Sequence, residues 1–447
     1  MADYMTYTAL TDAGAFVSKL ILFLPEDINA GAVGPQTFSV FVQRRHRATG
    51  ELIRLNRRNI SPEVLADAAD GLSQGYRPVK SAYPCDSDGL PLDRSCLLAL
   101  EMPYGPLEHL SAQGAQASGP YNDFVDMTIR VTQIAPIPGA PVCMGLVFDH
   151  CAGDLRPDIL GWEFSDQVDG AYPLRFGWFR PELAAGEKKP LLVWLHGAGG
   201  GGTDPRYPVQ GNRVTGFSSP EGQKALGGAW ILVPQCPTMW MDDGKNSPLM
   251  SNNNSIYVET VKKLVDAFIA EHEEEIDREQ IFIAGNSNGG FMTVKQIMTY
   301  PEFYAAAVPV CEAVLADLVS EDELAAVRDV PIWFVHSRYD FVVDPEKTVL
   351  PLYRRLKETG AQEVHLTYLD NIIDESGLFR NADGSPYMYI PHFAWVPVYN
   401  NACRTNADGM PVTKDGFQVG IFEWLRRTRL SQRKKREDSI YVASDPV

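Results

Sequence analysis

A serine stands in a glycine-rich turn in the middle of the sequence. Ser287 lies within GNSNGG, residues 285–290, directly after the apolar run 281–284. A strand that ends in Gly-x-Ser-x-Gly and continues as a helix is typical of a nucleophile elbow, a tight turn that exposes the serine hydroxyl above a sheet. Given the ordinary abundance of glycine and serine, the pattern arises by chance in about one chain in seven of this length. A plain turn is the alternative, so the surroundings must decide.

A second glycine-rich segment lies upstream. The apolar run 190–195 ends in His196, Gly197 and Ala198, and four glycines follow at 199–202. Glycine lets backbone N–H groups turn toward a ligand. If Ser287 is a nucleophile, the N–H groups of Ala198 and Asn288 are the expected oxyanion donors. A phosphate-binding loop is the alternative, but its Gly-Lys-Ser/Thr ending is absent. We expect His196 itself to be structural.

An acid and a histidine follow the serine in the order that catalysis would need. Asp340 comes just after the apolar strand 331–336, which places it at the carboxyl edge of a parallel sheet, where the serine also stands. Asp344 and Glu312 are the competing acids, and any of the three could be a solvated turn carboxylate.

Two histidines follow Asp340. His365 lies inside a predicted strand and should be fixed there, whereas His392 follows a long polar loop and can reach into a site. The sequence therefore predicts Ser287, Asp340 and His392 as catalytic residues, in the chain order of α/β-hydrolases.

The predicted elements around these residues follow two different sequence patterns. Residues 1 to about 155 contain short strand-like runs, such as 19–24, 37–43, 96–102 and 125–131, separated by turn residues. Alternation of apolar and polar residues over 125–131 predicts a strand with one wet face. We expect a small β-sandwich domain over 1–155, with one helix at 61–72.

From about residue 156 to 430, continuous apolar strands alternate with amphipathic helices, after a predicted hairpin at 161–181. This alternation predicts an α/β domain with a mostly parallel sheet and helices on both faces. Residues 431–447 form a polar C-terminal tail that contains the basic cluster 433–436.

Composition excludes several classes of function. The net charge of −17 argues against a nucleic-acid partner, because phosphate binding needs clustered Lys and Arg. No apolar run approaches 18 residues, and no signal peptide is evident at the N-terminus, so we expect a cytoplasmic protein without a membrane partner. The cysteines are odd in number and lack metal spacing, which favours reduced thiols over a Cys85–Cys96 or Cys143–Cys151 bridge. No metal and no cofactor are implied.

Residues 160 to 428 resemble the bacterial α/β-hydrolase esterases of the predicted-peptidase or depolymerase-like group. The matching blocks are PLLVWLHGAGGGGTD, ILVPQCP, IDREQIFIAGNSNGGF, YPEFYAAAVPVC, PIWFVHSRYDFVVDP and HFAWVPVY. Some members of that group carry an N-terminal immunoglobulin-like domain, as the texture of 1–155 suggests. The sequence departs from the group at Asn288, where Met is common, and at Pro391, where Gly is common before the histidine.

The sequence thus predicts a serine esterase that works through an acyl-enzyme, with a small-molecule or oligomeric ester as substrate and a homo-oligomer as a possible assembly. A serine peptidase like the prolyl oligopeptidases is the alternative, although residues 1–155 are too short for a seven-bladed propeller. A non-catalytic binding protein with the same fold is the second alternative.

Four aromatic residues beside the motifs could line a substrate pocket or pack the core: Trp240, Phe291, Tyr339 and Trp395. The polar stretch 371–390 is expected to be a substrate-lining flap, because it is longer than a usual connection, and the β region an independently folded accessory domain.

Overall fold

The computed structural model describes residues 2–55, 71–116, 121–165 and 172–433, and it divides into two compact units. The first unit comprises Met1–Asp166, Gly199–Ser219 and Ile373–Met388, and the second comprises Gln167–Ala198, Pro220–Ile372 and Tyr389–Val447. The change of texture near residue 155 lies close to the first break between them. Two later segments of the chain, however, belong to the first unit.

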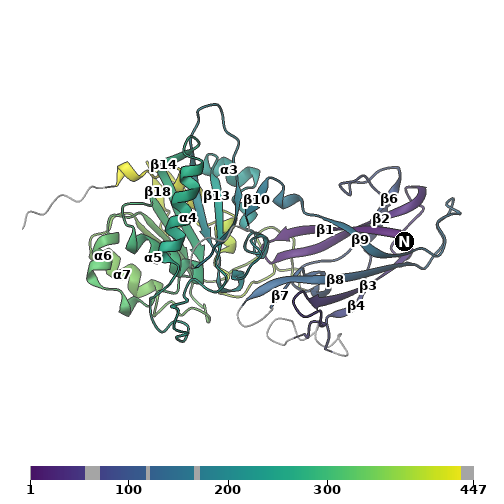
Figure 1. The fold of residues 1–447 in the computed structure, drawn as a ribbon, viewed down its shortest axis with the longest axis horizontal. Helices are drawn as coiled ribbons and strands as arrows, with labels where there is room; N and C mark the ends of the chain where they lie inside the picture. The colour runs from purple at the N-terminus through teal and green to yellow at the C-terminus, as the bar shows by residue number, and fades with distance from the viewer. Residues whose placement is uncertain (1, 56–70, 117–120, 166–171, 434–447) are drawn as a thin grey trace, which may run out of the picture. The chain divides into compact units, whose positions relative to one another are not determined.

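The first unit is built on a nine-stranded sheet in the order β4-β3-β8-β9-β1-β2-β6-β5, with β7 beside β8. Its neighbouring strands pair antiparallel, except β1 and β9, which are parallel. Figure 1 shows β8 beside β3 in this sheet. The strands are β1 (Ala2–Thr11), β2 (Gly14–Asn29), β3 (Phe38–His46), β4 (Gln74–Arg77), β5 (Ser81–Pro84), β6 (Arg94–Glu101), β7 (Gly114–Gln116), β8 (Asn122–Gln133) and β9 (Val147–Leu155).

The alternation expected over 125–131 is present in β8. Ile129 and Val131 are buried, while Asp126, Thr128 and Arg130 are exposed. Buried residues of β3 and β6, which lie at distant places in the strand order, belong to one apolar core together with β2 and β8. The sheet therefore curves over a common core.

The second unit is built on strands in the order β11-β13-β12-β14-β15-β16-β17. The pairs from β13 to β17 are parallel, and β11 is antiparallel to β13, so the sheet is mixed. The strands are β11 (Arg175–Phe179), β12 (Lys189–Leu195), β13 (Trp230–Gln235), β14 (Ile276–Asn286), β15 (Ala306–Val310), β16 (Ile332–Ser337) and β17 (Val364–Leu369). The helices are α3 (Pro220–Leu226), α4 (Val258–Glu271), α5 (Asn288–Thr299), α6 (Glu321–Val327), α7 (Val349–Glu358), α8 (Val396–Tyr399) and α9 (Ile421–Arg426).

Further short elements complete the described chain. They are β10 (Trp162–Ser165), α2 (Arg206–Gln210), the pair β18 (Thr413–Lys414) and β19 (Phe417–Gln418), and the 3-10 helices η1 (His109–Ser111), η2 (Pro157–Ile159), η3 (Ala198–Gly200), η4 (Val214–Gly216), η5 (Ala316–Leu318) and η6 (Leu430–Gln432). The predicted helix at 61–72, the tip of the hairpin 161–181 and the tail beyond 433 lie outside the described residues, wholly or in large part.

Helices cover both faces of the second sheet, as the continuous apolar strands predict. Along β12, Val193 points into the core that α4 and α5 share, while the ring centroid of Trp194 lies 5.0 Å from that of Tyr399 in α8. Along β16, Phe334 belongs to the same core as Val193, and Trp333 contacts Trp424 of α9 at 5.6 Å. Alternate residues of each strand thus meet helices on opposite sides.

Two expectations from composition can be compared with this structure. All seven cysteines are free in the structure, so neither of the bridges considered is present. Among the described helices, none is long and apolar enough to cross a membrane.

Candidate active site

Ser287 lies in a sharp turn between a buried strand and a buried helix. Strand β14 ends at Asn286, and α5 begins at Asn288. Ser287 has φ 56° and ψ −116°, a backbone conformation that costs a non-glycine residue on the order of 1–3 kcal/mol. Hydrogen bonds hold it there, since Ser287 N–H donates to Val310 O at 2.8 Å and Phe291 N–H donates to Ser287 O at 2.9 Å. A strained serine at this point is what a nucleophile elbow requires.

The glycines of this turn are required by close packing. A Cβ on Gly289 would lie 2.0 Å from Leu195 O at the end of β12, and a Cβ on Gly290 would lie 2.6 Å from Val310 O at the end of β15. A Cβ on Gly285 would meet backbone atoms at 2.7 Å. These distances are too short for any side chain, so the helix can approach the sheet only with glycine at these positions.

The structure brings Ser287, Asp340 and His392 together. His392 Nε2 lies 2.9 Å from Ser287 Oγ, and His392 Nδ1 lies 2.7 Å from Asp340 Oδ2. All three residues are at least nine-tenths buried. Asp340 follows β16 and Ser287 follows β14, so parallel strands bring both to one edge of the sheet. These contacts form an unbroken chain of hydrogen bonds from the hydroxyl to the carboxylate.

Asp340 is surrounded by hydrogen-bond donors. Its Oδ1 accepts from the N–H groups of Val342 at 2.8 Å and Val343 at 3.0 Å, while its Oδ2 lies 3.3 Å from His336 Nε2. Burial alone would raise the pKa of Asp340, but hydrogen bonds from His336 and His392 hold this pKa well below its ordinary value. The carboxylate is therefore charged at neutral pH and can accept the Nδ1 proton of His392.

His336 contacts the Asp340 carboxylate, and the sequence analysis did not predict this contact. It lies at the end of β16, four residues before Asp340, and is fully buried. Its Nε2 also lies 3.2 Å from Val343 O. A histidine at the end of the strand that carries the acid was the available signal, because such a side chain points to the same sheet edge.

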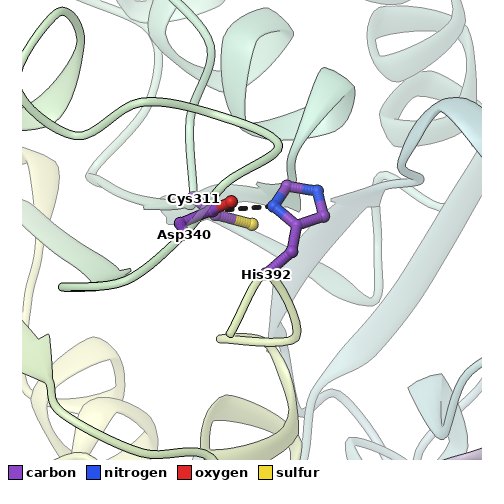
Figure 2. Close-up of side chains that lie close together, drawn as sticks. All are labelled: Cys311, Asp340 and His392. Atoms are coloured by element: carbon purple, nitrogen blue, oxygen red, sulfur yellow. Dashed lines mark hydrogen bonds and ion pairs between the residues drawn. The ribbon is translucent and has the colours of Figure 1, made fainter. Parts of the chain in front are cut away.

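Cys311 also lies beside this chain of hydrogen bonds (Figure 2). Cys311 Sγ, a carboxylate oxygen of Asp340 and a ring nitrogen of His392 all lie within 4.8 Å of one another. These are atom types that can bind zinc. Burial, followed by the charge of Asp340, raises the pKa of the Cys311 thiol well above its ordinary value, and Asp340 is already bonded to His392. We therefore interpret Cys311 as a packing neighbour of the hydrogen-bonded residues Asp340 and His392 and not as a metal ligand.

The competing candidates for the catalytic acid and base make other contacts. Glu312 follows β15 and is fully buried, but its Oε2 accepts from Val314 N–H at 2.6 Å, and burial raises its pKa to about 8. Asp344 is half-exposed and lies 3.4 Å from Lys347 Nζ. His365 lies inside β17, with its ring 5.5 Å from that of Trp333. No hydrogen bond from any of these three to Ser287 or His392 occurs among the described contacts.

The two predicted oxyanion donors belong to elements that meet at Ser287. Ala198 begins η3 after β12, and a Cβ on Gly197, the residue before it, would lie 3.6 Å from Ser287 Cβ. Asn288 is the first residue of α5, and its side-chain Oδ1 accepts from Trp240 N–H at 2.6 Å. The asparagine that departs from the family pattern thus ties the elbow to the segment after β13.

His196 has the structural role expected of it. Its Nδ1 lies 2.7 Å from Gly197 O, and its Nε2 accepts from Cys236 N–H at 3.3 Å. Burial lowers the pKa of His196 to about 4, so the ring is neutral. Trp240 Nε1 donates to His196 O at 3.0 Å and fixes the same strand end.

The four predicted pocket aromatics occupy different environments. Trp240 and Phe291 have no exposed surface and belong to the core of the second unit, so they contribute packing rather than surface for a ligand. Trp395 is buried, and its ring lies perpendicular to that of His392 at 5.4 Å. Tyr339 is 62% exposed beside Asp340.

Comparisons with known proteins agree with this architecture. Residues 182–367 match the family model described as Phospholipase/Carboxylesterase. That range contains Ser287 and Asp340 but ends before His392. A solved structure titled "Crystal Structure of a Thermostable Esterase" aligns with a TM-score of 0.68 at 23% identity, covering 95% of this chain and 99% of that chain. The chain contains an α/β-hydrolase fold.

Other solved structures are more distant. An acylaminoacyl peptidase from Pyrococcus horikoshii aligns with a TM-score of 0.38 at 16% identity, covering 68% of this chain and 49% of that chain. An acetyl xylan esterase from Aspergillus awamori aligns with a TM-score of 0.31 at 16% identity, covering 43% of this chain and 80% of that chain. No curated relative matches the sequence.

Proposed function

We propose that the protein is a serine hydrolase that cleaves carboxylic esters through an acyl-enzyme intermediate. The observation that carries the proposal is the chain of contacts from Ser287 Oγ through His392 to Asp340, at 2.9 and 2.7 Å. A solvated turn serine would not need a strained backbone, a buried histidine and a buried carboxylate aligned behind it.

The first chemical step follows from the protonation states. Because Asp340 is a carboxylate, His392 carries its proton on Nδ1 and presents the lone pair of Nε2 to Ser287 Oγ. As the Ser287 oxygen attacks the ester carbonyl, the hydroxyl proton moves to His392 Nε2, and Asp340 stabilises the imidazolium that forms. His392 then gives this proton to the alcohol oxygen as the ester bond breaks.

The second step reverses the roles of the same groups. Water attacks the acyl-serine while His392 Nε2 accepts its proton. His392 then gives this proton to Ser287 Oγ as the acyl–oxygen bond breaks, and the carboxylic acid leaves with Ser287 restored. The backbone N–H groups of Ala198 and Asn288 are the proposed donors to the oxyanion in both steps. One such donor is typically worth about 3 kcal/mol in the transition state.

The remaining features of the proposal concern the setting of this chemistry. The curved sheet over 1–155 is proposed as an immunoglobulin-like sandwich, supported by the core that β3 and β6 share. The seven free cysteines support a reducing, cytoplasmic setting. The proposed substrate is a small-molecule or oligomeric ester, and the proposed partners do not include nucleic acid.

The test combines a substrate screen with active-site labelling. Purified full-length protein is assayed on p-nitrophenyl esters of increasing chain length and on aminoacyl-anilides, and a fluorophosphonate probe is followed by intact mass. We expect ester turnover and a single label, both lost in Ser287→Ala. Turnover of anilides alone would replace the esterase by a peptidase. Absence of both turnover and label in the wild type would refute the proposal.

A further inference from the structure

The Oδ2 atom of Asp340 is shared by two imidazole rings. His392 Nδ1 lies 2.7 Å from this oxygen (Figure 2), and His336 Nε2 lies 3.3 Å from it. His392 continues the chain of contacts to Ser287 Oγ at 2.9 Å, whereas the proposed mechanism gives His336 no part. The two rings also differ in origin, because His336 belongs to β16 and His392 follows the long polar loop 371–390.

The neighbours of His336 determine which ring nitrogen carries its hydrogen. Nε2 faces two acceptors, the carboxylate oxygen of Asp340 and the carbonyl oxygen of Val343 at 3.2 Å. Nε2 therefore carries the hydrogen, because an unprotonated nitrogen would place its lone pair against those of both oxygens. The ring is thus held in the tautomer that directs an N–H group at Asp340.

The other nitrogen of this ring shows that packing alone does not account for a histidine here. His336 is fully buried, and within the described part of the chain its Nδ1 has no hydrogen-bond partner. A buried polar atom without a partner loses its hydration and recovers nothing. An apolar side chain of similar length would avoid that cost, but it would lack the N–H group that faces Asp340 Oδ2. The contact with the carboxylate is therefore what the histidine adds.

Resting on the proposed function, we propose that His336 is a positioning residue that acts on His392 through the shared oxygen of Asp340. Two N–H groups compete for the negative charge of one oxygen atom. While His336 donates, Oδ2 offers less charge to His392 Nδ1, so an imidazolium at His392 is less stabilised. His392 consequently remains an unprotonated base to lower pH than it would with Asp340 as its undivided partner.

Losing the His336 donor would not neutralise Asp340. Its Oδ1 would keep the N–H groups of Val342 at 2.8 Å and Val343 at 3.0 Å, and its Oδ2 would keep His392 Nδ1. Burial raises the pKa of Asp340, and the hydrogen bonds from His336 and His392 more than offset this effect. Because three donors remain, the carboxylate stays charged near neutral pH, and a change in the pH profile then arises at His392.

Two more titratable groups lie beside these residues, both after β15. Cys311 Sγ lies within 4.8 Å of the ligand atoms of Asp340 and His392, and burial raises the pKa of the thiol well above its ordinary value. Glu312 is the next residue, and burial raises its pKa to about 8. Both groups are the same in every variant compared below, so a difference between variants reports the His336 N–H group.

The test compares the pH profiles of three variants with that of the wild type. His336→Met replaces the ring with an apolar side chain of similar length, and His336→Gln keeps an amide N–H near the position of Nε2. His365→Met makes the same change at a histidine of β17 whose Nδ1 lies 3.3 Å from Asn406 Oδ1. The acid limb is measured by the rate at which a fluorophosphonate labels Ser287 and by kcat/KM on a dissolved p-nitrophenyl ester. Near-ultraviolet circular dichroism verifies each fold.

We expect His336→Met to move the midpoint of the acid limb upward by about half a pH unit, which is a roughly threefold loss of rate on that limb. His336→Gln and His365→Met should keep the wild-type midpoint. An unchanged or lowered midpoint in His336→Met would overturn the proposal whatever its activity, as would an equal shift in His365→Met. If His336→Met does not fold, His336→Leu replaces it, with the same expected shift.

The labelling reaction separates this inference from the proposed function, because it requires Ser287 and His392 but no ester. A midpoint that moves in His336→Met supports the role of His336 even if no ester is turned over, and the lack of turnover then counts only against the esterase. Equal midpoints with ester turnover leave the proposed function standing and refute the role of His336. Absence of both label and turnover in the wild type would refute both.

Discussion

The role of Asp340 can be tested by one substitution of nearly equal volume. In the wild type, the two carboxylate oxygens of Asp340 face different sets of donors. Asp340→Asn keeps one oxygen and replaces the other with an NH₂ group. Oδ1 accepts from the N–H groups of Val342 and Val343, and Oδ2 faces His392 Nδ1 and His336 Nε2. The two backbone donors cannot move without opening the turn, so the amide oxygen stays with them and the NH₂ group turns toward the two imidazoles.

This orientation predicts a large loss of turnover. An NH₂ group beside His392 Nδ1 favours the tautomer with the proton on Nε2, and that nitrogen then cannot accept the proton of Ser287. The same substitution in the best-studied serine protease lowers kcat about 10⁴-fold. Since each tenfold is about 1.36 kcal/mol, the expected rise in the activation barrier is about 5 kcal/mol. KM on a small ester should change little, because in the proposed mechanism Asp340 acts through its hydrogen bond to His392.

Steady-state kinetics on a dissolved p-nitrophenyl ester would measure this loss, with Asp344→Asn as the matched control. Asp344 is half-exposed, so its substitution should change kcat less than twofold. Near-ultraviolet circular dichroism would verify the fold of both variants. A kcat of Asp340→Asn within tenfold of the wild type would refute the reasoning and return Glu312 to consideration as the catalytic acid.

Four further predictions concern other parts of the structure. Ser287→Ala and Ser287→Gly should both lower kcat by on the order of 10⁶, while Ser287→Gly unfolds at about 1 kcal/mol higher free energy than Ser287→Ala, because glycine tolerates φ 56°; residual activity above a few per cent in either variant contradicts the nucleophile assignment. Burial raises the pKa of Glu312 from 4.5 to about 8, so the folded state holds this proton more tightly than the unfolded state; its stabilising effect is complete below pH 4.5 and is lost as pH rises through 8. Glu312→Gln should therefore lose less unfolding free energy than the wild type between pH 5 and 8, by on the order of 1 kcal/mol per pH unit in urea titrations, and parallel pH profiles would show that Glu312 is ionised throughout. Shortening 371–390 should change the ranking of ester substrates while some turnover remains, and an unchanged ranking would leave the segment without a role in selectivity. Phe379, only 8% exposed in the first unit, contacts aromatic rings that precede residue 155, so a chain that begins near 156 should aggregate in sedimentation assays unless Phe379→Ser is added; a soluble, active truncated chain would instead favour an accessory β domain.

Phe379 is anchored among residues of the first unit that precede residue 155. Its ring lies 6.3 Å from that of Phe16 and 6.2 Å from that of Tyr104, and a Cβ on Gly105 would lie 2.4 Å from it. The segment expected to act as a flap is therefore held by Phe16 of β2 and Tyr104 after β6, which precede it by more than 250 residues. Texture alone predicts a separate accessory domain, because composition does not reveal which distant surfaces a loop will cover.

Much of the catalytic sheet follows from local sequence. Apolar runs of strand length between amphipathic helices specify a parallel sheet covered on both faces, and parallel strands place residues after their carboxyl ends along one edge. The glycines around Ser287 are similarly readable, since a tight strand-to-helix turn leaves no space for a Cβ at Gly289 or Gly290. These features depend on neighbours within a few residues, which the sequence displays directly.

Contacts between distant segments were decided only by the tertiary structure. Asp340 and Glu312 both follow strands of the sheet, and the sequence favours Asp340 as the acid. The local pattern alone does not establish which carboxylate meets His392, because that contact depends on the direction of each turn relative to a loop 50 or more residues away. The fold directs Asp340 to the imidazole and buries Glu312 against Val314 N–H. It also buries Phe291 while leaving Tyr339 exposed, although both are aromatics next to motif residues. Side-chain burial is a property of the whole packed chain, and periodicity and spacing contain only its local part.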